Sequence, residues 1–178
     1  MHANVLALGA IALWSLLASL GLTLSHVPPF LLTGLALVIG SVPSWPLARQ
    51  WKTHPLTLAL GVCGLFGYHF LLFVALRVAP PVEANLVNYL WPLLIVVLAP
   101  ALLPGLRLRP AHVMAAVAGF VGAAIAILGA RAGDGAGSAW SWGYLPALGS
   151  AFIWATYSLL TRRVPAFPTA AVGLFGLV

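Results

Sequence analysis

The fourth long apolar stretch of this sequence carries polar side chains near its middle. At about 100° per residue, four of them share one arc of roughly a third of a helix: Asn85, Asn88, Tyr89 and Pro92. Pro92 has no N–H to donate to the carbonyl of Asn88, and its ring pushes that carbonyl away. A free carbonyl inside an apolar environment requires polar partners or a wet cavity. We therefore predict that this stretch faces a polar pathway; the alternative is a proline kink sealed by hydrogen bonds between helices.

Aromatic side chains with polar atoms recur at about the same depth in several apolar stretches. Such rings usually lie at membrane interfaces, so a band of them at mid-depth is unusual. For any one ring alone, a packed core position or a lipid-facing position is the equal alternative to a place in a site. Several rings at one depth predict a shared cavity with aromatic walls, suited to flat, partly apolar organic molecules. Together with Asn88, Tyr89 and Pro92, the candidate substrate-binding residues are Trp14, Tyr68, His69, Trp91, Trp154 and Tyr157.

Ionisable side chains within the apolar stretches are few. His69 at mid-depth is a functional candidate, and a neutral histidine bonded to a neighbouring helix is the equal alternative. Glu83 begins the fourth stretch, where the helix dipole favours a carboxylate and capping is the simpler explanation. These two residues are the candidates for proton coupling. Cys63 stands alone and the histidines are scattered, so we predict no metal site, no cofactor and no enzymatic activity.

The composition assigns these side chains to membrane helices. The chain is 62% hydrophobic and 6% charged, against roughly 25% charged residues in an average globular protein. Ten charged side chains cannot cover a soluble domain of 178 residues, whereas lipid accepts an apolar surface. Six runs approach the roughly 20 residues that a helix needs to cross a bilayer, and a seventh begins near Thr169. The six runs are Asn4 to Leu24, Pro29 to Leu47, Leu56 to Leu76, Pro81 to Leu103, Ala111 to Ala130 and Tyr144 to Leu160.

The basic residues predict how these helices are oriented. Short loops make neighbouring helices antiparallel, and six of the eight basic residues then fall on one side: Arg49, Lys52, Arg107, Arg109, Arg162 and Arg163. The other side has only Arg77 and Arg131. Basic residues in short loops stay cytoplasmic, so we expect a cytoplasmic amino terminus. This bias explains the net charge of +6, and the lipid bilayer rather than nucleic acid is the expected partner.

A short motif occurs twice in the sequence. ALGAIALW ends at Trp14 and ALGSAFIW ends at Trp154, an offset of 140 residues with five helices between the copies. An odd number of spans inverts the second copy, and inverted repeats are typical of secondary transporters with a site at the midplane. Coincidence in a chain rich in Leu and Ala is the alternative. We expect a first repeat over residues 1–140 and the start of a second over 141–178, in an all-α bundle of about ten helices when complete.

Small residues recur at i, i+4 spacing in the fifth run, at Ala115, Gly119 and Ala123. Rows of this kind allow two helix backbones to approach closely. We therefore expect the fifth run to be a packing scaffold and not a wall of the site.

Two segments carry a family resemblance: VEANLVNYLWPLLIVV and AFIWATYSLLTRR. They resemble the EamA-type branch of the drug/metabolite transporter superfamily, and within it the YddG-like aromatic amino-acid exporters. The resemblance implies ten helices in two inverted repeats, with both termini cytoplasmic, in a bacterial inner membrane. It also implies export of aromatic and other neutral amino acids through a central cavity. The lining that it implies comprises Trp14, Tyr68, Asn88, Tyr89, Trp91 and Trp154.

Other functions are less consistent with the residues. A phosphorylated substrate would call for Lys or Arg near a span centre, and none is found there. Aromatic faces also suit cations, so a broad exporter of cationic or amphipathic drugs is the alternative function. A membrane-embedded enzyme lacks a catalytic constellation, and a channel is disfavoured by the inverted repeat. We expect a monomer that alternates access to its cavity.

Overall fold

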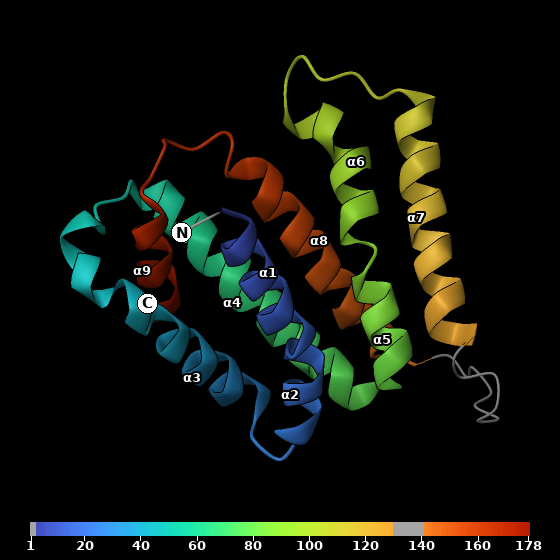
Figure 1. Ribbon diagram of the computed structural model, residues 1–178, viewed down its shortest axis with the longest axis horizontal. Coiled ribbons are helices and arrows are strands. Elements are labelled where there is room, and N and C mark those ends of the chain that lie inside the picture. Colours follow the sequence, from blue (N-terminus) through green and yellow to red (C-terminus); the bar gives the residue numbers. More distant parts are fainter. Residues whose placement is uncertain (1–2, 130–140) are drawn as a thin grey trace.

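The computed structural model describes residues 3–129 and 141–178, and every regular element among them is a helix. The predicted loop residue Arg131 lies outside the described residues. Figure 1 shows the helices gathered into one bundle, which confirms the predicted all-helical fold. The α-helices are α1 (Ala3–Ser15), α2 (Leu17–Thr23), α3 (Pro29–Ser41), α4 (Pro55–Val78), α5 (Pro81–Asn88), α6 (Trp91–Leu102), α7 (Pro110–Gly129), α8 (Tyr144–Leu160) and α9 (Val172–Leu177).

Three stretches of the described residues are long and apolar enough to cross a membrane: Pro29–Gln50, Pro55–Val78 and Pro81–Leu102. Two shorter apolar helical stretches are Ala7–Thr23 and Pro110–Gly122, the latter within α7. Two of the long stretches are interrupted, since α3 continues into the 3-10 segment η1 (Val42–Gln50) and the fourth run divides into α5 and α6. Pro43 and Pro46 account for the change to η1, because neither can donate the backbone bond that an α-helix requires.

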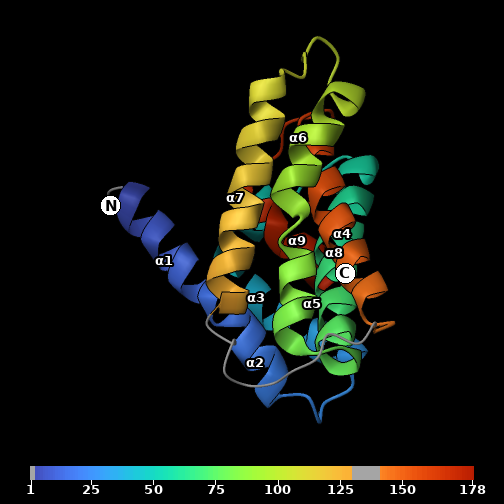
Figure 2. The same ribbon diagram turned by 90° about the vertical axis from the view of Figure 1, so that its right-hand side faces the viewer.

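The first predicted span is broken where the sequence gives no signal. Leu16 separates α1 from α2, and its N–H bonds to the Leu13 carbonyl three residues back, at 3.3 Å. The hydroxyl of Ser15 donates to the Ala12 carbonyl at 2.7 Å. Figure 2 shows α1 leaning away from the bundle above this break, while α2 stays against it. The predicted run from Asn4 to Leu24 is therefore helical, with an interruption at Leu16.

Helix α4 is the longest helix and forms the centre of the bundle, where it contacts α8, α3, α9 and α5. Its partner α8 presents small residues at i, i+4 spacing, and Ala147, Ala151 and Ala155 are fully buried. Helix α4 contributes Gly64 to this contact, and an added Cβ at Gly64 would lie only 2.3 Å from Cδ2 of Tyr157. The closest helix pair is therefore built from small residues on both sides, as is common in membranes.

The expectation that the fifth run is the close-packing scaffold was wrong for the described residues. Among the described residues helix α7 packs mainly against α6 and α5, and an added Cβ at Gly119 or Gly122 would meet nothing within 4 Å. The side chain of Ala123 lies outside the described residues. The same small-residue pattern thus serves close packing in α8 and leaves a largely exposed helix in α7.

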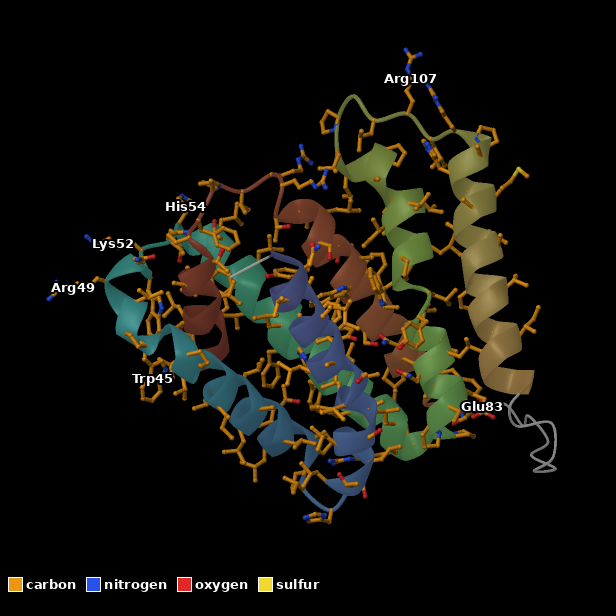
Figure 3. The ribbon with its side chains drawn as sticks, in the orientation of Figure 1. Trp45, Arg49, Lys52, His54, Glu83 and Arg107 are labelled. Atoms are coloured by element: carbon orange, nitrogen blue, oxygen red, sulfur yellow. The ribbon has the colours of Figure 1, made fainter. Side chains whose placement is uncertain are left out.

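Charged side chains lie at the ends of the bundle. Figure 3 shows Arg49, Lys52 and Arg107 along its upper and left margins, with Glu83 toward the lower right. Arg77, at the end of α4, donates from its guanidinium to the carbonyls of Leu24 and Val27 and so holds the turn before α3. Arg77 therefore stabilises the fold at its end of α4.

Candidate functional site

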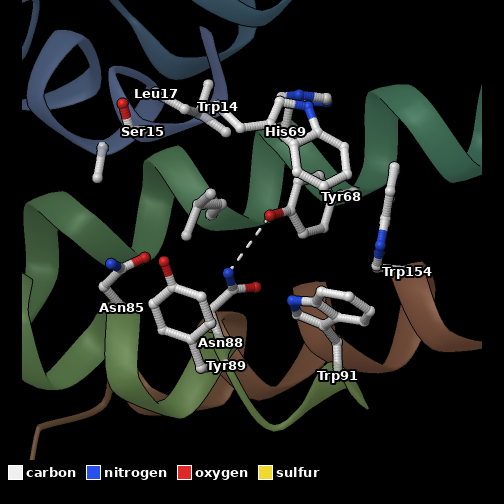
Figure 4. Close-up of a pocket in the computed structure, with 12 residues that line it drawn as sticks. Trp14, Ser15, Leu17, Tyr68, His69, Asn85, Asn88, Tyr89, Trp91 and Trp154 are labelled. Carbon is white, nitrogen blue, oxygen red and sulfur yellow. Dashed lines mark hydrogen bonds between the residues drawn. The ribbon is translucent and has the colours of Figure 1, made fainter. Parts of the chain in front are cut away.

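The described residues enclose a cavity of about 140 Å³ between the α1–α2 break, α4, the α5–α6 break and α8. Figure 4 shows its lining side chains converging from these elements. Among the described residues that line it there is no Lys, Arg, Asp or Glu, so its polarity comes from amides, hydroxyls, indoles and one imidazole. The lining residues are Trp14, Ser15, Leu17, Ala18, Tyr68, His69, Leu72, Asn85, Asn88, Tyr89, Trp91 and Trp154.

Trp154 is the centre of an aromatic cluster on one side of this cavity. Its ring centroid lies 4.8 Å from that of Tyr68 and 5.7 Å from that of Trp14, with the latter pair edge to face. Offset and edge-to-face arrangements at these distances are the favourable ones for aromatic rings. Trp14 is nevertheless 60% exposed, so this wall of the cavity is open. The cluster leaves aromatic faces available to a further ring.

The two tryptophans of the repeated motif meet in this cluster. Trp14 comes from α1 and Trp154 from α8, and Figure 1 shows the two helices running in opposite directions along the bundle. This is the arrangement that an inverted pair of helices requires, with both copies contributing to one site near the middle.

A chain of hydrogen bonds crosses the other side of the cavity. The side-chain amide of Asn88 donates to the Tyr68 hydroxyl at 3.3 Å, the bond drawn in Figure 4. The hydroxyl of Ser150 on α8 donates to the amide oxygen of Asn88 at 2.8 Å. Both Asn88 and Ser150 are buried. Sequence reasoning missed Ser150; the signal was the polar residue in ALGSAFIW at the position where the first copy has Ala10.

His69 lines the same cavity from α4. Its Nδ1 lies 2.7 Å from the carbonyl oxygen of Leu65, one turn back in the helix. A carbonyl can only accept, so Nδ1 carries the proton and Nε2 of the neutral ring is left as an acceptor. Within the described part of the chain, His69 therefore bonds inside its own helix, whereas the alternative interpretation expected a bond to a neighbouring helix.

Three predicted site residues lie elsewhere. Tyr157 packs against Gly64 and against the ring of Trp154, whose centroid is 5.6 Å away. Pro92 is exposed in the first turn of α6, and Glu83 lies in the first turn of α5. None of the three lines the cavity, whereas Asn85, Ser15, Leu17, Ala18 and Leu72 do. Among the described residues no group of three His, Cys, Asp or Glu side chains lies close enough to hold a metal ion.

The fourth run is broken beside the cavity, as its proline predicts. Helix α5 ends at Asn88 and α6 begins at Trp91, with Pro92 in the first turn, where a missing N–H is tolerated. The N–H of Leu90 bonds to Val87 only three residues back, at 3.1 Å. This break turns Tyr89 and Trp91 toward the cavity together (Figure 4).

Replacing Pro92 with alanine is expected to restore an N–H that can pair with the Asn88 carbonyl and to join α5 to α6. We expect a stable, membrane-inserted protein in which transport, the activity that the family resemblance implies, falls about threefold or more, because the break positions two cavity residues. The measurement is flux of labelled amino acid at equal amounts of folded protein. Pro100→Ala, inside α6 and away from the cavity, is the matched control. Unchanged flux in the Pro92 variant would show that the break serves packing alone.

These features define a multi-pass helical membrane protein with a cavity where two oppositely directed helices meet. The chain belongs to the EamA-like transporter family, which matches residues 1–128. It is 46% identical over 187 residues to an aromatic amino acid exporter, YddG, of Ancylobacter novellus. A solved structure titled only as the crystal structure of a protein superposes with a TM-score of 0.76 at 46% identity and covers 94% of this chain.

The chain spans only part of both relatives. The alignment with the exporter covers 98% of this chain and 63% of the exporter, and the solved structure is matched over 60% of its own length. The family match confirms the predicted EamA-type resemblance.

Proposed function

We infer that this chain forms part of an exporter of aromatic and other neutral amino acids. The observation that carries this inference is the aromatic cluster of Trp14, Tyr68 and Trp154, which borders a cavity without charged lining among the described residues. Flat apolar rings fit such walls, and a neutral lining suits a zwitterion better than a phosphorylated compound. The similarity to an aromatic amino acid exporter supports the same substrate class.

Two breaks that flank the cavity support the proposal of transport by alternating access. Leu16 divides α1 from α2, and Tyr89 and Leu90 divide α5 from α6. Breaks of this kind absorb changes of backbone angle while the helical segments move as rigid bodies. The first repeat over residues 1–140 and the start of a second over 141–178 are the proposed moving units.

Flux into proteoliposomes tests the proposed function. The full-length transporter should move labelled tryptophan and phenylalanine, and an applied pH gradient should change the rate if Glu83 or His69 carries protons. Excess unlabelled aromatic amino acid should compete, whereas a cationic drug should not. Competition by the drug alone would favour the broad exporter of cationic compounds, for which aromatic walls are also suited.

The proposed location is a bacterial inner membrane with a cytoplasmic amino terminus, and cysteine labelling tests the orientation. In a Cys63→Ala background, Lys52→Cys and Arg107→Cys should be shielded from an impermeant thiol reagent added outside intact cells. His26→Cys, in the exposed turn on the opposite side, should react. The reason is the excess of basic residues in the loops that carry Lys52 and Arg107. Reversed labelling would contradict both the orientation and the direction of export.

A further inference from the structure

In the hydrogen bonds between Ser150 and Asn88 and between Asn88 and Tyr68, each side chain has a defined role as donor or acceptor. The Ser150 hydroxyl lies 2.8 Å from the amide oxygen of Asn88 and 2.7 Å from the carbonyl oxygen of Ala147. One hydroxyl proton serves two acceptors here. If it pointed only at Ala147, the oxygens of Ser150 and Asn88 would face each other at 2.8 Å with no proton between them. Donation to Asn88 removes that repulsion, and the Ala147 carbonyl keeps its helical bond within α8.

This direction decides what the amide of Asn88 presents. With its oxygen held by Ser150, its nitrogen faces Tyr68 and donates to the phenolic oxygen at 3.3 Å. In this orientation both ends of the amide have a partner, since its oxygen accepts from Ser150 and its nitrogen donates to Tyr68. Ser150 is 0% exposed and Asn88 is 3% exposed, so water does not compete with these two bonds.

The Tyr68 hydroxyl is consequently left with a proton to donate. Its oxygen already accepts from Asn88, so the hydroxyl proton turns away from that bond. Tyr68 lines the cavity, and Figure 4 shows its hydroxyl between Trp14 and His69 on one side and Tyr89 and Trp91 on the other. The chain from α8 through α5 to α4 thus ends in a hydrogen-bond donor aimed at whatever occupies the cavity.

We propose that the Tyr68 hydroxyl binds the carboxylate of an amino acid substrate and that Ser150 is the positioning residue that keeps it a donor. The proposal rests on the proposed function. A carboxylate is the strong acceptor of a zwitterion, and hydrogen bonds to ionised acceptors are the stronger ones. The described lining residues include no Lys or Arg to bind that group, so a neutral donor takes the task. The Trp154 ring, 4.8 Å from that of Tyr68, is then placed to contact the substrate's own ring.

Binding of tryptophan and tryptamine to the purified full-length transporter tests this proposal. Both ligands carry an indole ring and an ammonium group, and only tryptophan carries a carboxylate. Tyr68→Phe should weaken tryptophan binding about tenfold and change tryptamine binding less than about twofold. Ser150→Ala should weaken tryptophan about threefold, since the Asn88 amide is then free to turn over. Ser158→Ala, on the same helix and outside the hydrogen-bond chain, is the matched control.

Asn88→Asp adds a test with opposite signs. A carboxylate at this position accepts from both Ser150 and Tyr68, which draws the Tyr68 proton away from the cavity and adds negative charge. Tryptophan should therefore bind more weakly and tryptamine, a cation, more tightly. Equal losses for both ligands in the Tyr68 and Ser150 variants, or unchanged tryptophan binding in the Asn88 variant, would overturn the carboxylate subsite. Folded wild-type protein that binds neither ligand would overturn the proposed function itself.

Discussion

Replacing Trp154 with alanine is expected to lower the flux of tryptophan and phenylalanine about three- to tenfold more than the flux of threonine. Trp154 contacts the rings of Trp14, Tyr68 and Tyr157, and it forms an aromatic wall of the cavity. A favourable aromatic pair contributes about 0.5–1.5 kcal/mol beyond burial, and about 1.4 kcal/mol corresponds to a factor of ten. A small substrate makes no such pair and should lose little. The measurement is the ratio of aromatic to threonine flux in proteoliposomes, normalised to folded protein.

The control for this experiment is another tryptophan outside the cavity. Trp142 is 75% exposed just before α8, so Trp142→Ala should leave the ratio unchanged. Trp91→Ala, which removes another aromatic side chain from the cavity lining, should shift the ratio in the same direction as Trp154→Ala. A purely structural role for Trp154 predicts a different result, because a large hole lowers the amount of folded protein and harms all substrates alike. A ratio at the wild-type value in both cavity variants would refute the aromatic site.

Replacing Gly64 with alanine is expected to destabilise the protein by about 1–3 kcal/mol or more. The added Cβ would lie 2.3 Å from Cδ2 of Tyr157, 2.5 Å from Cγ and 3.0 Å from Cβ. These atoms are close to the backbone of α8, so the clash cannot be relieved by moving the end of a flexible side chain. Alanine improves helix propensity by about 0.8–1 kcal/mol, which is too little to offset the separation of α4 from α8. The measurement is thermal unfolding of purified protein in detergent.

Gly119→Ala is the matched control, since it makes the same substitution in a long helix with nothing within 4 Å of the new Cβ. It should be neutral or slightly stabilising. Combining Gly64→Ala with Tyr157→Leu should recover part of the lost stability if the Tyr157 ring is the obstacle. Equal effects of the two glycine substitutions would show that α4 and α8 are not in close contact at Gly64.

The composition and the lengths of the apolar runs were enough to predict a helical membrane bundle. Lipid imposes two simple requirements, an apolar surface and internal backbone hydrogen bonds, and long apolar runs in the sequence indicate that both are met. Depth in the membrane is likewise a matter of position along a run. For this reason the linear sequence alone could group Trp14, Tyr68, Asn88, Trp91 and Trp154 at one depth, and the cavity indeed brings them together.

Only the tertiary structure decided which side chains face the cavity and which helices pack closely together. Trp154 and Tyr157 lie one turn apart on α8, yet only Trp154 lines the cavity, because Gly64 leaves space for the Tyr157 ring against α4. Small residues at i, i+4 spacing occur on both α7 and α8, and the pattern alone does not say which has a close neighbour. No proline lies at the break at Leu16, so the sequence does not predict this break.

The hydrogen bond of Ser150 to Asn88 could likewise not be predicted from the sequence. Its type and spacing are those of many small residues in membrane helices, and its partner Asn88 lies 62 positions away in the sequence. The sequence by itself determined which residues lie at the depth of the site. Only the packing of α8 against α4 and α5 decided which of their polar atoms meet. A hydrogen bond tolerates a change of only a few tenths of an ångström in its donor–acceptor distance, and a sequence pattern does not specify distances so finely.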